Sequence, residues 1–430
     1  MANPEFDFLI VGTGAGGATL ARELSKKGKK VQLIEKGKYE NRLGTFKDSL
    51  RFYDSNQLTK MPRKSKEGVI LWRTIMAGGS TMVSCGNATR CLEKELDDLG
   101  LNLNEEFQEA EREMEITYFP EELLSEGSKK ILWASKELGY QMRLTPKFIN
   151  IESCTSCGQC AFGCIKNAKW TALYYLNQAI KDGANIVYNV SVEKVIQENG
   201  KAIGIRGIGQ NGTVDYFADK VILSAGGLGT PVILQKSGIL NAGSNFFSDL
   251  LINTYGITNN HNQINEPVMA LIDEEFYQSK GFILSTYVNT HKMVRFIEIG
   301  PRGLTLPVNR LIGIMTKIID ESAGYINSNG VISKPVTNRD WQRLREGSAI
   351  AKEILIKAGA DSHSILFSKV QGAHPGGTAS IGMIVDRNLQ TEIKNLYVCD
   401  ASILPKSPGM PPILTICALA KKLAKKLLIS

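Results

Sequence analysis

The sequence lacks any apolar run of the roughly 20 residues needed to cross a lipid bilayer, and it is poor in aromatic residues and histidine. Aromatic residues make up 7% of the 430 residues, and histidine occurs four times. So few aromatic side chains argue against a platform on which nucleic-acid bases stack. Internal repeats and low-complexity tracts are also absent. With 43% hydrophobic and 22% charged residues, the composition is typical of a globular protein of two or three domain-sized units.

The net charge of +8 comes from basic residues spread along most of the chain. Such charges are typical of solvated helix surfaces, although a basic face would also attract an acidic electron-transfer protein. The N-terminus carries acidic residues and runs directly into an apolar segment, so we expect no signal peptide and a cytoplasmic protein. The eight cysteines would then stay reduced, and clustered ones indicate metal ligands or catalytic groups.

A glycine-rich loop follows the first apolar segment, which spans residues 6–11 (FDFLIV). The loop at 12–17 (GTGAGG) fits the pattern G-x-G-x-x-G, and a helical pattern and a second apolar strand at 31–34 come after it. In such a unit the glycines permit a tight turn, close approach of a pyrophosphate and close packing of the helix, whose N-terminus attracts phosphate. Glu35 closes the second strand and can accept hydrogen bonds from ribose hydroxyls, which favours FAD or NAD over NADP.

Further segments along the chain favour FAD. Residues 77–90 (AGGSTMVSCGNATR) form a glycine-rich turn, and residues 221–239 (VILSAGGLGTPVILQKSGI) combine a strand, a second turn and a helix that Pro231 would open. The C-terminal part contains HPGGTASIGM and NLYVCDASILP before a final helix from about Pro411. In this order the segments resemble the glucose–methanol–choline (GMC) family of FAD-dependent oxidoreductases, particularly the branch similar to cholesterol oxidases and long-chain alcohol oxidases.

The resemblance implies an α/β fold, α+β overall, in which a Rossmann-type FAD-binding domain with a parallel sheet joins a substrate domain with an antiparallel sheet and helices. The FAD-binding domain would be discontinuous and comprise residues 1–149, 169–240 and 365–430. Residues 150–168 would be a cysteine-rich insertion, and residues 241–364 the substrate domain. Within the latter, the sequence YINSNGV indicates a hairpin that turns at Asn-Gly.

The resemblance also assigns residues to the cofactor. Val192 would contact the adenine through its backbone, and Asp400 with Ala401 would lie at the ribityl chain and flavin. The helix that starts near Pro411 would direct its N-terminus at the pyrimidine end of the flavin, where a positive dipole end stabilises the anionic reduced ring. The predicted cofactor-binding residues are Gly12, Thr13, Gly14, Ala15, Gly17, Glu35, Lys36, Gly79, Ser80, Val192, Asp400, Ala401 and Pro411.

His374 is the predicted catalytic residue. It lies in a glycine-rich loop, a poor place for a packing histidine, and it matches the family's active-site histidine in HPxG. The resemblance implies that it acts as base or hydrogen-bond partner for the substrate hydroxyl while a hydride passes to the flavin. The family's second active-site residue, usually His or Asn, corresponds here to Pro411, which has neither a side-chain donor nor an N–H. Ser84 also stands where many relatives carry Asn, so the usual active-site pair is incomplete.

Half of the cysteines lie within eleven residues, in the run CTSCGQCAFGC. The spacing C-x2-C-x2-C-x3-C resembles bacterial ferredoxins and predicts a 4Fe–4S cluster. Because the fourth cysteine of such runs can ligate a different cluster, Cys85 or Cys91 could replace it as a remote ligand. Structural zinc, and an empty run as in some GMC relatives, are the alternatives. The predicted metal ligands are Cys154, Cys157, Cys160 and Cys164.

These features together predict an FAD-dependent dehydrogenase that oxidises a CH–OH group of a small alcohol-like substrate. Electrons would leave through the cluster to an acceptor protein such as a ferredoxin. A flavin-dependent reductase or desaturase acting on C=C or C=O is one alternative, which the proline at 411 supports. An electron-transfer flavoprotein subunit of a larger complex and an oxygen-using alcohol oxidase are the others.

Overall fold

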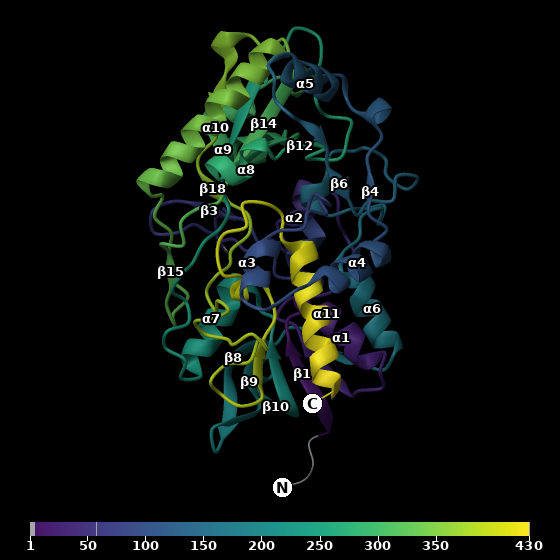
Figure 1. The fold of residues 1–430 in the computed structure, drawn as a ribbon, viewed down its shortest axis with the longest axis vertical. Coiled ribbons are helices and arrows are strands. Elements are labelled where there is room, and N and C mark those ends of the chain that lie inside the picture. Colours follow the sequence, from purple (N-terminus) through teal and green to yellow (C-terminus); the bar gives the residue numbers. More distant parts are fainter. Residues whose placement is uncertain (1–4, 57, 430) are drawn as a thin grey trace.

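The computed structural model describes residues 5–56 and 58–429. The chain is built on two sheets that lie one beyond the other along the long axis, with helices around each (Figure 1). This mixture of parallel and antiparallel strands with helices confirms the predicted α/β class. None of the helices in these two ranges combines the length and the apolarity that crossing a membrane would require.

The first sheet has the strand order β7-β2-β1-β10-β9-β8, and β19 pairs with β10 as well. The predicted strands at 6–11 and 31–34 are present with these bounds. The strands are β1 (Phe6–Val11), β2 (Val31–Ile34), β7 (Asn185–Val187), β8 (Ser191–Glu198), β9 (Lys201–Gly209), β10 (Gly212–Leu223) and β19 (Leu396–Val398).

Strand β10 pairs with its neighbours in two ways. Its second half, from Ala218 to Leu223, runs parallel to β1 and to β19, whereas its first half pairs antiparallel with β9. The last three residues of β10, Val221 to Leu223, are buried and apolar, as expected for strands covered on both faces. The carboxyl ends of β1, β10 and β19 therefore meet at one edge of the sheet, where ligands bind in open α/β folds.

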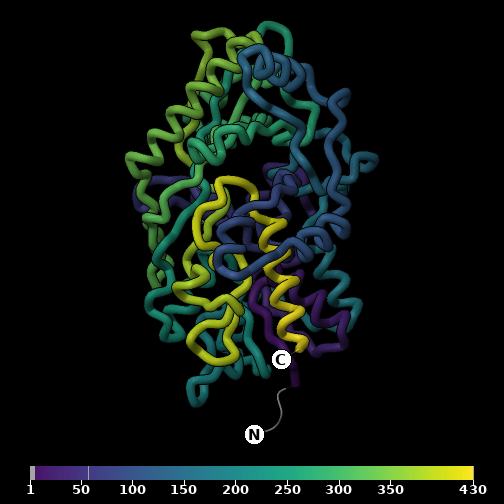
Figure 2. Tube along the Cα trace, in the orientation of Figure 1, coloured from purple at the N-terminus to yellow at the C-terminus, as the bar shows by residue number. Residues whose placement is uncertain are grey.

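Helices α1 (Ala15–Ser25), α6 (Ala172–Lys181) and α11 (Ile413–Ile429) pack together beside this sheet. Figure 2 shows the C-terminal segment, in yellow, running back alongside the N-terminal one. The predicted final helix thus begins two residues after Pro411.

Helix α7 (Gly226–Lys236) corrects one prediction, because Pro231 lies inside this helix and does not open it. Proline has no N–H to donate to the carbonyl four residues earlier, which here belongs to Gly227. The Oγ1 of Thr378 donates to that carbonyl at 2.9 Å instead. A partner 151 residues away thus satisfies the group that the proline leaves without a helical donor.

The second sheet has the order β3-β18-β11-β14-β13-β12-β5, and β17 pairs with β11. All neighbours are antiparallel except β3 and β18. The strands are β3 (Ile70–Leu71), β5 (Arg143–Leu144), β11 (Leu250–Ile257), β12 (Leu271–Asp273), β13 (Phe282–Thr286), β14 (Leu311–Ile318), β17 (Leu366–Phe367) and β18 (Gln371–Gly372).

Helix α10 (Asn338–Lys357) covers one face of this sheet. A Cβ on Gly347 of α10 would collide with the side chain of Thr316 in β14, so Thr316 points at the helix. Because side chains alternate along a strand, Met315 and Lys317 point to the opposite face. That face borders the cavity described below.

The other strands and helices lie outside the two large sheets or around them. The predicted Asn-Gly hairpin is formed by β15 (Tyr325–Ile326) and β16 (Ile332–Ser333), which pair antiparallel. The remaining strands and α-helices are α2 (Phe46–Ser49), α3 (Glu93–Asp98), α4 (Asn104–Glu113), β4 (Thr117–Tyr118), α5 (Glu126–Glu137), β6 (Pro146–Lys147), α8 (Glu275–Lys280) and α9 (Lys292–Ile299).

A buried ion pair ties β14 to the start of α10. Lys334 Nζ lies 3.0 Å from a carboxylate oxygen of Asp320, and both side chains are fully buried. We expect Lys334→Met to lower the free energy of unfolding by about 3–5 kcal/mol, since it leaves a buried carboxylate unpaired. Lys94→Met, which removes an exposed pair with Asp98, is the control and should cost about 0.5 kcal/mol or less. Chemical denaturation measures both, and equal losses would contradict the prediction.

Candidate functional site

A cavity of about 790 Å³ lies between the carboxyl edge of the first sheet and the open face of the second. Its walls come from segments far apart in the sequence, from Val11 to Ile416. Twelve of the thirteen predicted cofactor-binding residues line it, together with His374. The lining predicted residues are Gly12, Thr13, Gly14, Ala15, Glu35, Lys36, Gly79, Ser80, Val192, Asp400, Ala401 and Pro411.

The loop after β1 shows why glycine occupies its three positions. Gly12 has a φ of +98°, which L side chains rarely adopt, and a Cβ there would collide with the carbonyl of Ser224. Gly17 does not line the cavity, and its missing side chain lets α1 pack against the carbonyl of Gly12. Gly14 is different, because a Cβ there meets no protein atom within 4 Å. The protein itself leaves room for a side chain at Gly14, so the free space suits a ligand.

Glu35 directly follows β2, and its carboxylate binds the glycine loop. Its carboxylate accepts hydrogen bonds from the N–H of Thr13 (3.0 Å) and its hydroxyl (2.7 Å). The other oxygen accepts from the N–H of Gly37 at 2.7 Å. Burial raises the pKa of this carboxyl, and the hydrogen bonds from Thr13 and Gly37 oppose the shift. Glu35 therefore holds the glycine loop against β2 while it lines the cavity.

A second turn closes over the glycine loop. Gly79 begins a short 3₁₀ helix, and a Cβ there would lie 3.1 Å from the Cα of Gly14. The N–H of Gly78 donates to the hydroxyl of Thr13 at 3.2 Å. Ser80 accepts from the N–H of Thr74 at 3.1 Å through its hydroxyl oxygen. The two turns thus present backbone to the same part of the cavity.

Asp400 follows β19 and fixes the start of α7. One oxygen accepts from the N–H of Gly226 (2.8 Å) and the hydroxyl of Thr230 (2.6 Å), and the other accepts from the N–H of Ser402 (2.7 Å). Burial raises the pKa of this carboxyl, and these donors oppose the rise. The residues just before α11, among them Pro411, also line the cavity. Helix N-termini, where free N–H groups favour negative charge, therefore border the cavity.

His374 pairs with a residue that sequence reasoning missed. Its Nδ1 lies 2.8 Å from a carboxylate oxygen of Asp249, which is fully buried. Asp249 also accepts from the hydroxyl of Ser407 and the N–H of Gly409, so it acts as an acceptor and Nδ1 carries the proton. The Nε2 of His374 makes no hydrogen bond to any residue in the described ranges, and the ring lines the cavity.

The environment of His374 favours its neutral form. Burial lowers the pKa of the imidazole, the charge of Lys317 lowers it further, and Asp249 opposes both effects. The side chain is 23% exposed, and because it lines the cavity this surface faces the cavity. A neutral imidazole with a free Nε2 can accept a proton from a bound molecule.

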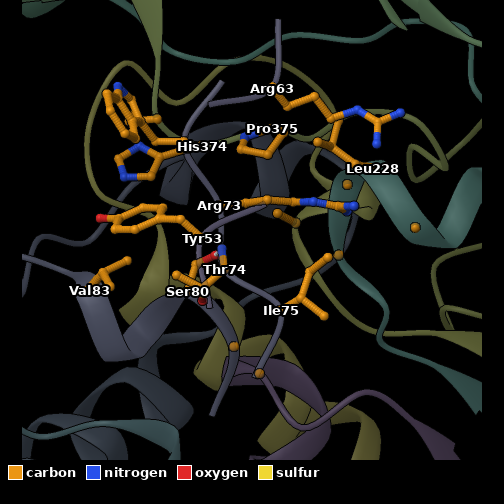
Figure 3. A pocket seen from close by; sticks show the side chains of 18 of the residues that line it. Tyr53, Arg63, Arg73, Thr74, Ile75, Ser80, Val83, Leu228, His374 and Pro375 are labelled. Carbon is orange, nitrogen blue, oxygen red and sulfur yellow. Dashed lines mark hydrogen bonds between the residues drawn. The ribbon is translucent and has the colours of Figure 1, made fainter. Parts of the chain in front are cut away.

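Figure 3 shows the rings of His374 and Tyr53 on one side of the pocket and the side chains of Arg63 and Arg73 on the other. The Nε of Arg73 binds Asp54 at 2.6 Å, and Tyr53 donates to the carbonyl of Ala161 at 2.7 Å. Tyr53, Arg63 and Arg73 belong to no motif, which is why sequence reasoning did not select them.

The part of the cavity under the second sheet is mostly apolar. Leu251, Met269, Met315 and Ile297 line it. Glu298 is one of the polar residues here, and burial raises the pKa of its carboxyl. It accepts hydrogen bonds from Tyr255, Asn289 and Asn253. The remaining polar residues that sequence reasoning missed here are Lys317, Asn253, Tyr287 and Gln371.

The cysteine run lies beside the cavity, and the buried Lys169 fixes it to the turn at 82–87. Lys169 Nζ donates to the carbonyls of Met82, Ser84 and Cys160. The buried Lys147 joins the same turn to Val268, because its Nζ donates to the carbonyls of Cys85 and Val268 and to the side chain of Asn87. Burial lowers the pKa of Lys147 to about 8. The cysteine run and the turn at 82–87 are therefore held as one unit.

None of the eight cysteines forms a disulfide bond. Their thiols also do not form a complete set of metal ligands. Within residues 5–56 and 58–429, no three His, Cys, Asp or Glu side chains form a group that could hold a metal ion. Cys85 packs in the same apolar cluster as Cys160, and burial raises its pKa to about 11. Cys91 instead contacts Thr415 of α11. Cys399 and Cys417 are fully buried.

Relatives and solved structures show what the chain is similar to. An uncharacterised protein of Methanocaldococcus jannaschii is 31% identical to this chain. The match covers 98% of this chain and 100% of that protein. The long-chain-alcohol oxidase FAO3 of Arabidopsis thaliana is 23% identical over 96% of this chain, which spans 66% of that protein. Pyridoxine 4-oxidase from Mesorbium loti has the same fold, with a TM-score of 0.75 and 17% identity over 99% of this chain and all of its own.

The family models match most of the chain. Residues 6–251 match the N-terminal model of the GMC oxidoreductases, and residues 331–420 match the C-terminal one. Between them, the two matches include the segments that carry the resemblance. The G-x-G-x-x-G loop lies in the first match and the HPGG loop in the second. The resemblance is therefore confirmed, and this chain belongs to the GMC family of FAD-dependent oxidoreductases.

Proposed function

We propose that the protein oxidises the CH–OH group of a small alcohol and that His374 accepts the hydroxyl proton. The observation that carries this proposal is the free Nε2 of His374, which shares one cavity with the glycine loop while Asp249 binds Nδ1. The relatives named as alcohol oxidases support the same chemistry. The mostly apolar lining under the second sheet favours an alcohol with an apolar body.

The residues around the cavity fit FAD. The space beside Gly14 admits a pyrophosphate against the backbone, where the first N–H groups of α1 have no side-chain cap. We assign the adenosine end to Glu35, Lys36 and Val192. The second turn, Gly79 and Ser80, and the C-terminal residues Asp400, Ala401 and Pro411 would enclose the flavin end.

The mechanism divides between the cofactor and the chain. Bound FAD supplies the acceptor for a hydride from the alcohol carbon. The chain positions the hydroxyl at Nε2 of His374, which takes its proton, so that the alcohol becomes a carbonyl compound. Asp249 keeps Nδ1 protonated and stabilises the imidazolium that forms, as an oriented carboxylate does for a histidine base.

The cysteine run supports a separate proposal, that Cys154, Cys157 and Cys160, with Cys164 or Cys85, bind a 4Fe–4S cluster. The spacing favours it, and Gly158 and Gly163 have the positive φ that tight wrapping requires. The thiols do not converge in the present arrangement, so no step of the mechanism above depends on a cluster. With one, the physiological acceptor would be a ferredoxin-like protein in the cytoplasm.

The domain division is also a proposal. Residues 241–364 would form the core of a substrate domain, because they contribute β11 to β14 and α10. Strands β3, β5, β17 and β18 of the same sheet come from outside that range. The FAD-binding part would hold the first sheet, and residues 150–168 would be an insertion at its edge.

Gly14→Val tests the cofactor site. Because a Cβ at this position meets no protein atom, the variant should keep the wild-type melting temperature of the flavin-free protein. It should lose at least tenfold in FAD affinity, since the side chain occupies the space assigned to the pyrophosphate. Fluorescence titration with FAD measures the affinity. Gly209→Val, at the end of β9 and outside the cavity, controls for the added side chain, because its φ is not positive and a Cβ there would make only ordinary contacts of 3.7 Å or more. Unchanged FAD binding by Gly14→Val would refute the site.

His374→Gln tests the base. Anaerobic flavin reduction by a panel of primary alcohols from 1-butanol to 1-hexadecanol should slow by about 10²–10⁴-fold, the usual contribution of a positioned base. In the wild type, kcat/KM should be constant at neutral pH and fall as the pH drops through a value below the ordinary 6.5 of histidine, because the pKa of His374 is lowered. Wild-type reduction rates in His374→Gln would exclude the assigned role, and absence of any alcohol oxidation would exclude the function.

Anaerobic purification tests the cysteine run. We expect about four iron and four sulfide per flavin, and a loss of both in Cys157→Ser. Cys399→Ser, at a buried cysteine away from the run, should retain them. Zinc in place of iron, or metal-free protein that produces hydrogen peroxide from alcohols, would overturn the cluster and support an oxygen-using oxidase.

A further inference from the structure

Lys317 is a charged residue of the cavity to which the mechanism above gives no task. It lies on β14, on the face opposite α10, and it is paired in register with Leu251 of β11 and Ile283 of β13. Its side chain is 2% exposed and lines the same cavity as His374. His374 binds Asp249, which lies two residues before Leu251, the cross-strand partner of Lys317. Lys317 and His374 therefore border the same part of the cavity.

Lys317 differs from the other buried lysines in the described part of the chain. Lys147 and Lys169 each donate three hydrogen bonds, and Lys334 and Lys421 form ion pairs. The Nζ of Lys317 has no hydrogen bond or ion pair with any residue in 5–56 or 58–429. An ammonium that is buried without a partner is costly, and proteins keep one mainly where function requires it.

The carboxylates near Lys317 are committed to other groups. Asp249 binds His374, Ser407 and Gly409. Asp320 binds Lys334 and the N–H of Ser248. Burial lowers the pKa of Lys317, and the charges of Asp249, the Cys85 thiol and Asp320 oppose this shift. The free donors of Lys317 are therefore available to a molecule that enters the cavity.

The chain also lacks a polar side chain where one is expected. Pro411 occupies the position of the second active-site residue and can neither donate nor accept a proton through its side chain. Its backbone carbonyl is already used, because it accepts from the hydroxyl of Thr89 at 3.1 Å. A second donor to the substrate oxygen must come from another part of the cavity wall.

We propose that Lys317 is that donor, a catalytic residue whose ammonium binds the oxygen of the substrate alcohol beside His374. As Nε2 of His374 takes the hydroxyl proton, negative charge grows on this oxygen, and the ammonium stabilises it. The hydride carries two electrons from the alcohol carbon to the flavin, and the C–O bond becomes C=O. Lys317 itself keeps its protons throughout. This proposal rests on the proposed function, because it concerns the same reaction.

Lys317 also favours the neutral form of the base. Burial is the largest cause that lowers the pKa of His374, the positive charge of Lys317 lowers it further, and Asp249 opposes both. With Lys317 in place, His374 stays neutral and ready to accept a proton at neutral pH.

Lys317→Met tests the assignment, because methionine has a similar length and no charge. We expect kcat for the best primary alcohol of the panel to fall by about 10²–10³-fold, as on loss of one donor to a developing oxyanion. FAD content should not change, and the melting temperature should rise, because an unpaired buried charge is removed. The acid limb of kcat/KM should move to higher pH, since the charge that lowers the pKa of His374 is gone.

Two variants control the experiment. Lys317→Arg keeps the charge and should restore part of kcat and leave the acid limb near its wild-type position. Lys369→Met removes an exposed lysine outside the cavity and should change neither kcat nor the pH profile. Loss of activity in Lys317→Met together with a lower melting temperature or failed folding would mean a structural role and would overturn the proposal. An unchanged kcat or an unmoved acid limb would overturn it as well.

The test separates this proposal from the proposed function. If wild-type protein oxidises no alcohol of the panel, the function fails. The pKa of His374, followed by NMR in the FAD-loaded protein, and the melting temperature of Lys317→Met then still decide whether Lys317 is an unpaired charge beside the base. If wild-type protein oxidises alcohols and Lys317→Met does so equally well, only the inference about Lys317 fails.

Discussion

The cavity depends on direct contact between backbone segments, without side chains between them. The turn after β1 rests on the turn after β10, because Gly12 presents no Cβ to the carbonyl of Ser224. Gly16 in α1 meets the carbonyl of Cys399 after β19 in the same way, and Gly227 in α7 meets the carbonyl of Pro375. Any larger residue at these positions would push apart the strand ends that form the cofactor edge. These glycines allow close backbone contact because they carry no side chain. The space beside Gly14, in contrast, is not filled by protein atoms.

The charges around the reacting atoms are arranged by the same architecture. Asp249 stands at the start of β11 and Lys317 at the end of β14, two antiparallel neighbours that bring both residues close to the HPGG loop. Asp249 fixes the proton on Nδ1 of His374, and Lys317 favours its neutral form. The second sheet therefore positions the two charges, and the HPGG loop carries the histidine.

The parts of this fold that the sequence predicts well are those with local causes. Strands β1 and β2 and the Asn-Gly hairpin follow from short apolar patterns and turn residues, and they appear where expected. Helix α7 was misjudged at Pro231, because the group that satisfies the exposed carbonyl comes from Thr378. Asp249 and Lys317 carry no motif at all. Their importance arises only when folding places them beside His374, which sequence spacing cannot show.

The order in which the cavity walls occur along the chain has a consequence for biosynthesis. The walls begin at Val11 and end at Ile416, and β19, which completes the cofactor edge, is made only near the end of translation. A ribosome releasing the chain from its N-terminus exposes the dinucleotide loop long before the strands and turns that enclose it exist. The cavity is therefore complete only late in synthesis, and a chain shortened before α11 would lack the part of its wall that Ile413 and Ile416 supply.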